Sequence, residues 1–201
     1  MKYSVFKKFL ILVVVSFMGA IVNPVMDVSL SQGVSKEIEE SIIEDDVKED
    51  PEIDDKPGDT FGYLDILSAW FYEKPDEPDY LYIAMKIREL KISLRTVFSV
   101  YWMYNEVRYV STMFVGSYGT YWSVGYFDRG WQTTRSNGSY DLQSGAITMK
   151  IQKSKIGNPQ PGDELTDTYA LAWQKIIFGW IPWFVDHAPD KGYGENYIIQ
   201  Y

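Results

Sequence analysis

Apolar and polar side chains alternate with a period of two in two neighbouring runs, residues 64–72 and 81–87. Such alternation is typical of strands that bury one face and expose the other, so both runs are predicted to be antiparallel strands. An acidic, proline-containing stretch separates them and predicts a turn. The positions that share one face are Leu64, Ile66, Ser68, Trp70 and Tyr72 in the first run, and Leu81, Ile83, Met85 and Ile87 in the second.

The remainder of the chain continues this pattern of short strands and turns. Asn105-Glu106 is a short polar turn between two apolar runs, which predicts a hairpin. Residues 166–180 fit a strand or a short helix, and the alternation of Tyr169, Leu171 and Trp173 favours the strand. No long amphipathic helix is indicated, so the fold class is all-β, an antiparallel β-sandwich of the jelly-roll or immunoglobulin-like type. Strands are expected at residues 95–104, 107–115, 121–127, 146–151, 166–180 and 197–201, and loops at residues 156–165 and 186–196. Residues 128–141 are expected to form a loop or a loosely paired excursion.

The first 31 residues have the composition of a targeting segment. Lys2, Lys7 and Lys8 precede an uninterrupted apolar run over residues 9–22, the order found in a secretory signal peptide. The alternative is an uncleaved N-terminal membrane anchor, because the apolar stretch approaches the ~20 residues that span a bilayer. Both interpretations place the domain at residues 50–201 outside the cell, secreted or held at the outer face of the membrane.

Negative charge is concentrated before and at the start of this domain. The chain carries a formal charge of −9, and residues 35–59 alone hold 12 Asp/Glu and 3 Lys. Residues 32–49 are therefore interpreted as an acidic flexible linker, with a short helix through Ile38, Ile42 and Ile43 as the alternative. Residues 60–201 hold 13 Lys/Arg and 15 Asp/Glu, a formal charge of −2, and they lack the basic surface that phosphate backbones require, so nucleic acid is not an expected partner.

Composition narrows the chemistry further. The chain has no cysteine and its one histidine is His187, which excludes disulfides, a cysteine nucleophile and a two-histidine metal site within one chain. No serine elbow or glycine-rich phosphate loop is present, and the acidic residues lie in Pro/Gly-rich segments typical of solvated loops. Because such surroundings do not raise a carboxyl pKa as acid catalysis demands, the protein is expected not to be an enzyme.

Two acidic segments are candidates for a calcium site. Calcium takes 6–8 oxygen ligands, which aspartate-rich loops supply without a strict motif. If the first and last strands are neighbours, the two segments meet, and a calcium ion there would have a structural role. The competing interpretation is that Asp and Pro simply form turns at an exposed edge. The candidate ligands are Asp50, Asp54, Asp55 and Asp59 in the front segment, and Asp186 and Asp190 in the rear one.

Aromatic residues provide the candidate ligand surface. Trp102, Tyr104, Trp122 and Trp131 are expected on consecutive strands and their loop, and Trp and Tyr rings stack on the apolar faces of sugars. Because side chains alternate between the two faces of a strand, Trp102 and Tyr104 share one face, and Tyr101 and Met103 share the opposite face. One of these faces is core and the other is outside, and the sequence leaves open which. Asn137 begins an Asn-Gly-Ser glycosylation sequon, expected in a surface loop.

Several motifs in order resemble a known group of domains. They are Asp50-Pro51-x-x-Asp54, Leu64-Asp65-Ile66-x-x-x-Trp70, the strand at residues 80–87, Lys155-Ile156-Gly157, and Asp186-x-Ala188-Pro189-Asp190-x-Gly192-Tyr193-Gly194. Together they resemble secreted archaeal β-sandwich domains related to family-nine carbohydrate-binding modules and DOMON domains, over residues 50–201. The resemblance implies a jelly-roll-like sandwich that often carries calcium, with acidic positions at Asp50, Asp54, Asp65, Asp186 and Asp190. It departs from the group at Asp55-Lys56, where the relatives have Gly-Asp-Val, and it transfers neither a sugar specificity nor a haem ligand.

These observations lead to one functional expectation and one alternative. The expectation is an extracellular, non-catalytic, carbohydrate-binding-like module that binds a surface or extracellular polysaccharide and is stabilised by calcium. The alternative is a structural cell-envelope or surface-assembly protein that contacts envelope proteins and has no small ligand. In both cases the membrane is contacted only through the N-terminal segment.

Overall fold

The computed structural model describes residues 52–127, 130–175 and 182–201, and in these ranges the chain consists of strands and turns without an α-helix. The fold class is all-β, as the alternation predicted. The predicted leader at residues 1–31 and linker at 32–49 lie outside the described residues. Across the described ranges no helix has the length and apolar character needed to cross a membrane. The elements are β1 (Ile53–Asp54), β2 (Ile66–Tyr72), β3 (Tyr80–Ile87), β4 (Thr96–Tyr104), β5 (Val107–Gly116), β6 (Gly119–Phe127), β7 (Trp131–Arg135), β8 (Asn137–Asp141), β9 (Ala146–Gln152), the short 3-10 helix η1 (Lys153–Lys155), β10 (Glu164–Lys175), β11 (Pro182–Ala188) and β12 (Tyr197–Ile198).

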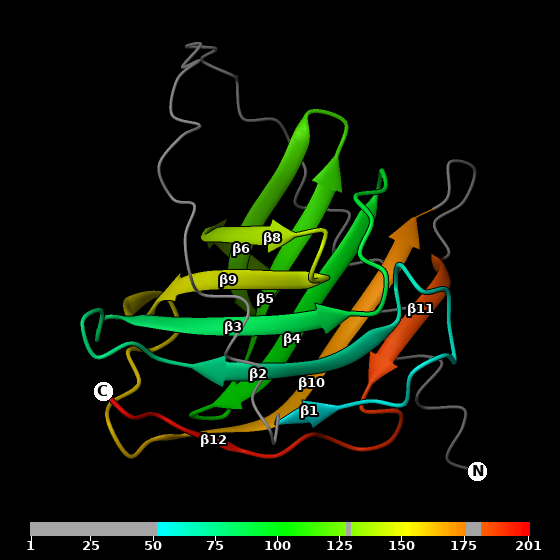
Figure 1. The fold of residues 1–201 in the computed structure, drawn as a ribbon. Coiled ribbons are helices and arrows are strands. Elements are labelled where there is room, and N and C mark those ends of the chain that lie inside the picture. The colour runs from blue at the N-terminus through cyan, green and yellow to red at the C-terminus, as the bar shows by residue number, and fades with distance from the viewer. Residues whose placement is uncertain (1–51, 128–129, 176–181) are drawn as a thin grey trace. The chain divides into compact units, whose positions relative to one another are not determined.

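The strands form two antiparallel sheets. One sheet has the order β1-β2-β3-β9-β8, and the other has the order β11-β10-β4-β5-β6-β7, with β12 paired to β10. Figure 1 shows the two sheets as layers, one in front of the other, with the strands of one running across those of the other at a large angle. This is a sandwich-like arrangement, in which each sheet hides one face against its neighbour.

The core lies between the sheets and follows the predicted alternation of β3. Leu81, Ile83, Met85 and Ile87 are all fully buried in one cluster with the inward residues of the other sheet. Phe71 of β2 meets Trp102 of β4 edge-to-face, with ring centroids 5.7 Å apart. Because these two residues belong to different sheets, the contact joins the two layers directly.

The predicted face of β2 is wrong over the second half of that strand. Leu64 and Ile66 are in the core, but Ala69 and Phe71 follow them there instead of Ser68, Trp70 and Tyr72. The pairing of β2 with β3 shifts register between Ile66 and Ser68. One extra residue at such a bulge exchanges the inward and outward positions of everything that follows, because the side-chain period is two.

The predicted hairpin at Asn105-Glu106 is confirmed. β4 and β5 pair from Tyr104 and Val107 outward, and the two turn residues have φ angles of 48° and 63°. Positive φ at both central residues is the conformation of the two-residue turn that matches the twist of the flanking strands. The turn fixes which residues of β4 and β5 point into the core.

Strands lie within residues 128–141, where the sequence allows a loop or a loosely paired excursion, and at the start of a segment predicted as a loop. Residues 128–141 include β7 and β8, and the segment expected to begin at Asp186 is instead strand β11 as far as Ala188. β7 is largely exposed and polar, so it has no buried face to produce an apolar alternation. Conversely, the closing strand expected at residues 197–201 is only β12, two residues long.

Gly138 allows β8 to lie close to the opposite sheet. A Cβ atom added at Gly138 would lie 2.3 Å from the indole ring of Trp122 on β6, although β6 and β8 belong to different sheets. The glycine therefore lets the margins of the two sheets approach each other, with Trp122 filling the space between them.

Substituting Gly138→Ala is expected to lower the free energy of unfolding by about 1–3 kcal/mol, because overpacking forces the indole or the strand to move. Chemical denaturation would measure this change. Ser139→Ala, an exposed neighbour on the same strand, is the control and should stay within about 0.5 kcal/mol of the original protein. An equal effect of the two substitutions would contradict the packing role of Gly138.

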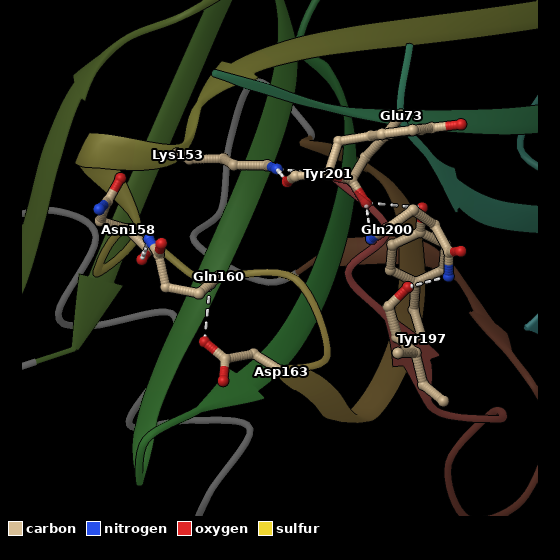
Figure 2. Close-up of polar contacts among 9 residues, drawn as sticks. Glu73, Lys153, Asn158, Gln160, Asp163, Tyr197, Gln200 and Tyr201 are labelled. Carbon is tan, nitrogen blue, oxygen red and sulfur yellow. Dashed lines mark hydrogen bonds and ion pairs between the residues drawn. The ribbon is translucent and has the colours of Figure 1, made fainter. Parts of the chain in front are cut away.

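Buried charges hold the C-terminal segment against the domain (Figure 2). The Glu73 carboxylate pairs with Lys153 Nζ, and the side chains of these two residues are 0% and 4% exposed. The same carboxylate accepts the Gln200 backbone N–H at 2.6 Å and the Tyr197 hydroxyl at 3.2 Å. Lys153 Nζ also donates to the main-chain oxygen of Tyr201. One ion pair thereby connects β2, η1 and the end of the chain.

Candidate functional site

Three aspartates that are far apart in the sequence meet beside the edge of the sandwich. Asp55, Asp59 and Asp186 each offer a carboxylate oxygen, and these three atoms all lie within 4.8 Å of one another. Calcium–oxygen distances are 2.3–2.6 Å, so two ligands on opposite sides of one ion are at most about 5 Å apart. The separation of these three oxygens therefore suits a single shared calcium ion.

Backbone contacts bring the three residues to this place. Asp55 follows β1, and its N–H donates to the Leu67 carbonyl of β2 at 3.1 Å. Asp186 lies on the inward side of β11, opposite Ala172 of β10. Its Oδ2 accepts the Ile66 N–H at 2.6 Å, which ties β11 of one sheet to β2 of the other. The position of the site is thus a consequence of how the two sheet edges meet.

Asp65 organises the turn that carries Asp59. Its side chain is fully buried, and Oδ2 accepts the Gly58 N–H at 2.8 Å and pairs with Arg88 Nε at 2.9 Å. In the sequence, only the family resemblance indicates Asp65. A single acid inside an apolar run has no characteristic spacing to other acids that would mark it as functional. Arg88 thus balances the charge of Asp65, beside the group of three aspartates.

Two oxygens of the group are buried without a hydrogen-bond partner, namely Oδ2 of Asp55 and Oδ1 of Asp65. A carboxylate oxygen removed from water and left unpaired costs free energy, so buried acids are normally hydrogen-bonded, paired with a cation or bound to a metal. A bound cation or a proton would relieve this cost for Asp55. The Asp55 oxygen is an observation separate from the clustering itself, and it too indicates a missing positive partner, whereas the Asp65 carboxylate is already paired with Arg88.

The electrostatics of the group oppose ionisation. Burial above all, together with the charges of Asp59, Asp55 and Asp65, raises the pKa of Asp186 to about 7. Burial and repulsion from Asp190 and Asp59 likewise raise the pKa of Asp55 to about 6. The pKa of Asp59 is raised for the same reasons, burial first and then Asp190. A divalent cation would reverse this balance, because it favours the charged form of each ligand.

The donor set fits calcium. All the candidate ligands are carboxylates, the hard oxygen donors that calcium and magnesium prefer. Turn residues around Asp59 allow the irregular geometry that calcium accepts more readily than magnesium does. Since the ligands come from the start and the end of the domain, the ion would join those ends in a chain without disulfides.

The six predicted calcium ligands do not all come together in the structure. Asp55, Asp59 and Asp186 come together, and Asp190 is near enough for its charge to raise the pKa values of Asp55 and Asp59. Asp54 is exposed on β1 opposite Ser68 and is not part of the group of three. Asp50 lies outside the described residues. The expectation that the rear acids sit in a solvated loop is wrong for Asp186, which is a buried residue of β11.

The predicted aromatic platform is wrong for Trp102 and Tyr104. Both point into the core, where Trp102 is 0% and Tyr104 is 8% exposed, so neither offers a ring face to a sugar. Trp122 is half-buried and packs against the same core. Trp131 is half-buried as well, with Tyr101 and Phe127 at its edges, 6.4 Å and 5.5 Å between ring centroids. The period of two allowed either face, and the burial of Trp102 decides between them.

The outer face of the larger sheet carries a row of rings instead. Tyr101 and Tyr169 stack with centroids 4.6 Å apart and planes 3° apart, and Tyr169 stacks on His187 at 5.3 Å. Cross-strand aromatic pairs of this kind stabilise a sheet. Because the stacked rings cover one another's faces, this row stabilises the sheet rather than providing a flat platform.

Asn137 of the glycosylation sequon is exposed, but it lies in strand β8 rather than in the expected loop. β8 is the last strand of its sheet, paired on one side with β9. The side chain is therefore accessible at a sheet edge, and modification there stays a prediction.

Comparisons with known proteins do not add an identity. No protein-family model, no curated protein and no solved structure matches the chain.

Proposed function

We propose that this protein is an exported, non-catalytic binding module, a jelly-roll- or immunoglobulin-like sandwich whose two ends are joined by a structural calcium ion. The observation that carries the proposal is the meeting of Asp55 and Asp59 with Asp186, over a sequence separation of about 130 residues. Turn formation alone can explain why acidic residues that are neighbours in the sequence, such as Asp55 and Asp59, occur together in a loop. It does not explain why a buried acid on a distant strand faces them.

The binding part of the proposal is a saccharide at or near the cell surface. It is supported by the exposed aromatic side chains at one end of the larger sheet, which include Phe114, Tyr118 and Tyr121. It is also supported by the resemblance to carbohydrate-binding modules over residues 50–201. Export rests on the basic and apolar pattern of residues 1–31.

Calcium is expected to raise the melting temperature of the protein, and a chelator to lower it again. At a calcium concentration of 100 Kd, binding to the folded state alone adds about 2.7 kcal/mol to the free energy of unfolding. Asp186→Asn should abolish this calcium effect while keeping an oxygen to accept the Ile66 N–H. Differential scanning calorimetry with and without calcium measures both results.

The matched control is Asp54→Asn, since Asp54 is an exposed acid only one residue before Asp55. This variant should keep the full response to calcium. A melting temperature that does not change between calcium and chelator would overturn the metal part of the proposal. An equal loss of response in both variants would show nonspecific charge screening instead of a site.

A further inference from the structure

A shallow, widely open cavity of about 410 Å³ lies at the tip of the β5–β6 hairpin. In Figure 1 this hairpin extends past β8, the last strand of the other sheet, so the tip is not sandwiched between layers. The volume is at the small end of the range for small-molecule sites, 300–1,000 Å³. The residues that line the cavity are Arg95, Phe114, Gly116, Ser117, Tyr118 and Tyr121.

Three aromatic side chains around the cavity are open to solvent. Phe114, Tyr118 and Tyr121 are 36%, 89% and 38% exposed, and large apolar side chains gathered on a surface are typical of interaction sites. The rings of Phe114 and Tyr121 lie 6.1 Å apart and are inclined by 30°. This pair is stacked across the hairpin, as the rings around Tyr169 are across their strands, but more than a third of each residue remains exposed and available to a ligand.

Gly116 keeps the cavity open. A Cβ atom at this position would lie 2.6 Å from the Tyr121 ring and 3.1 Å from the Phe114 ring. Any larger residue would therefore displace the rings that form the walls. The glycine is required by the close approach of the rings to the backbone.

Arg95 places a positive charge at the same cavity. Its φ angle is 66°, an uncommon conformation for a long side chain, and its N–H donates to the Val115 carbonyl at 2.7 Å. Throughout the described ranges, the hydrogen bonds and ion pairs found include none to the Arg95 guanidinium. Arg95 is a half-buried residue that lines the cavity together with the aromatic side chains, and its guanidinium is free to bind an anion.

We infer that this cavity binds an acidic saccharide, a uronic acid unit of a polysaccharide. This inference rests on the saccharide-binding function proposed above and specifies its site and ligand class. The apolar C–H face of a pyranose ring would pack on Tyr121 or Tyr118. The carboxylate would pair with the Arg95 guanidinium, whose planar fork matches a carboxylate with two parallel hydrogen bonds. The Ser117 and tyrosine hydroxyls offer both donors and acceptors to sugar hydroxyls.

Titration calorimetry of the full-length protein with trigalacturonate and with the neutral galactose trisaccharide tests this. The acidic trisaccharide is expected to bind at least tenfold more tightly than the neutral one. Arg95→Gln should remove that difference, Arg95→Lys should retain part of it, and Tyr121→Ala should weaken binding of both sugars at least tenfold. Arg135→Gln is the control, because it removes the same charge from an exposed position on β7 and should change nothing.

Equal affinity for the two trisaccharides, or full binding by Arg95→Gln, would overturn the inference, and so would a failure of both sugars to bind. The melting temperature with calcium and with chelator is measured on the same samples. A retained calcium effect together with absent or unselective sugar binding rejects this ligand assignment while leaving the metal site in place. Loss of the calcium effect in the unsubstituted protein rejects the proposed metal site instead.

Discussion

Replacing Lys153 with methionine is expected to lower the free energy of unfolding by about 3–5 kcal/mol. The substitution leaves the Glu73 carboxylate, whose side chain is fully buried, without its cation. The penalty arises from the uncompensated buried charge more than from the loss of the attraction itself. Methionine retains the length and apolar stem of lysine, so the effect on packing is small. For a domain of this size the melting temperature should fall on the order of 10 °C.

The double variant Glu73→Gln/Lys153→Met separates charge from shape. Glutamine still offers an oxygen to the Tyr197 hydroxyl and the Gln200 N–H, and no buried charge remains, so the double variant should recover most of the loss. Lys191→Met, at an exposed lysine, is the control and should stay within about 0.5 kcal/mol. A double variant as unstable as Lys153→Met alone would show that the contribution of Lys153 is not electrostatic.

Calcium is expected to reverse the way in which stability depends on pH. Without calcium, the free energy of unfolding should fall as the pH rises from about 4 to about 7. The reason is that Asp55 and Asp186 have pKa values of about 6 and about 7 in the folded protein, against 3.8 ordinarily. In that interval the folded state binds more protons than the unfolded state, and under this condition stability decreases with increasing pH.

With calcium, stability should instead rise over the same interval, because the ion binds the ionised carboxylates and competes with their protons. At 1,000 Kd of calcium the gain near pH 8 is about 4 kcal/mol. The charges that act on the two acids are those of Asp59, Asp65 and Asp190, and Arg88 is paired to Asp65. Denaturant titrations at pH 5 and pH 8, with calcium and with chelator, measure the four stabilities.

Asp186→Asn distinguishes the two effects. Without calcium it should make the protein less sensitive to pH and more stable at pH 8, because it removes a buried charge. With calcium it should show no gain. Parallel pH profiles with and without calcium in the unsubstituted protein would contradict a shared site at these acids, since a proton-linked ion cannot leave the slope unchanged.

Much of the architecture was predictable because it depends on local pattern. Leu81, Ile83, Met85 and Ile87 share one face in the sequence pattern and lie together in the core, and Asn105-Glu106 forms the turn that its position between two apolar runs indicated. β7 was not predictable, since an exposed polar strand has no buried face to leave a pattern. The prediction of which β2 residues face the core failed from Ser68 onward for a different reason. The bulge that exchanges the two faces is a property of strand pairing, which the sequence of one strand does not contain.

The candidate sites depend less on local pattern. The abundance of acids at the two ends of the domain was visible, but the choice of Asp55, Asp59 and Asp186 over Asp54 follows from where the chain after β1 and strand β11 place each carboxylate. The unpartnered oxygen of Asp65 and the ring-lined cavity beside Arg95 require distances between residues on different strands. The spacing of residues along the sequence does not reveal such distances.

By itself the sequence determined that this is an all-β chain of short antiparallel strands, with its charge gathered in acidic segments and without cysteine chemistry. Those properties follow from the side-chain period and from composition, which act over a few residues at a time. Only the tertiary structure decided that Trp102 is core and not platform, that Asp186 faces Asp55, and that Arg95 is free beside exposed rings. These outcomes depend on register and on how two sheets pack, where a shift of one residue exchanges inside for outside.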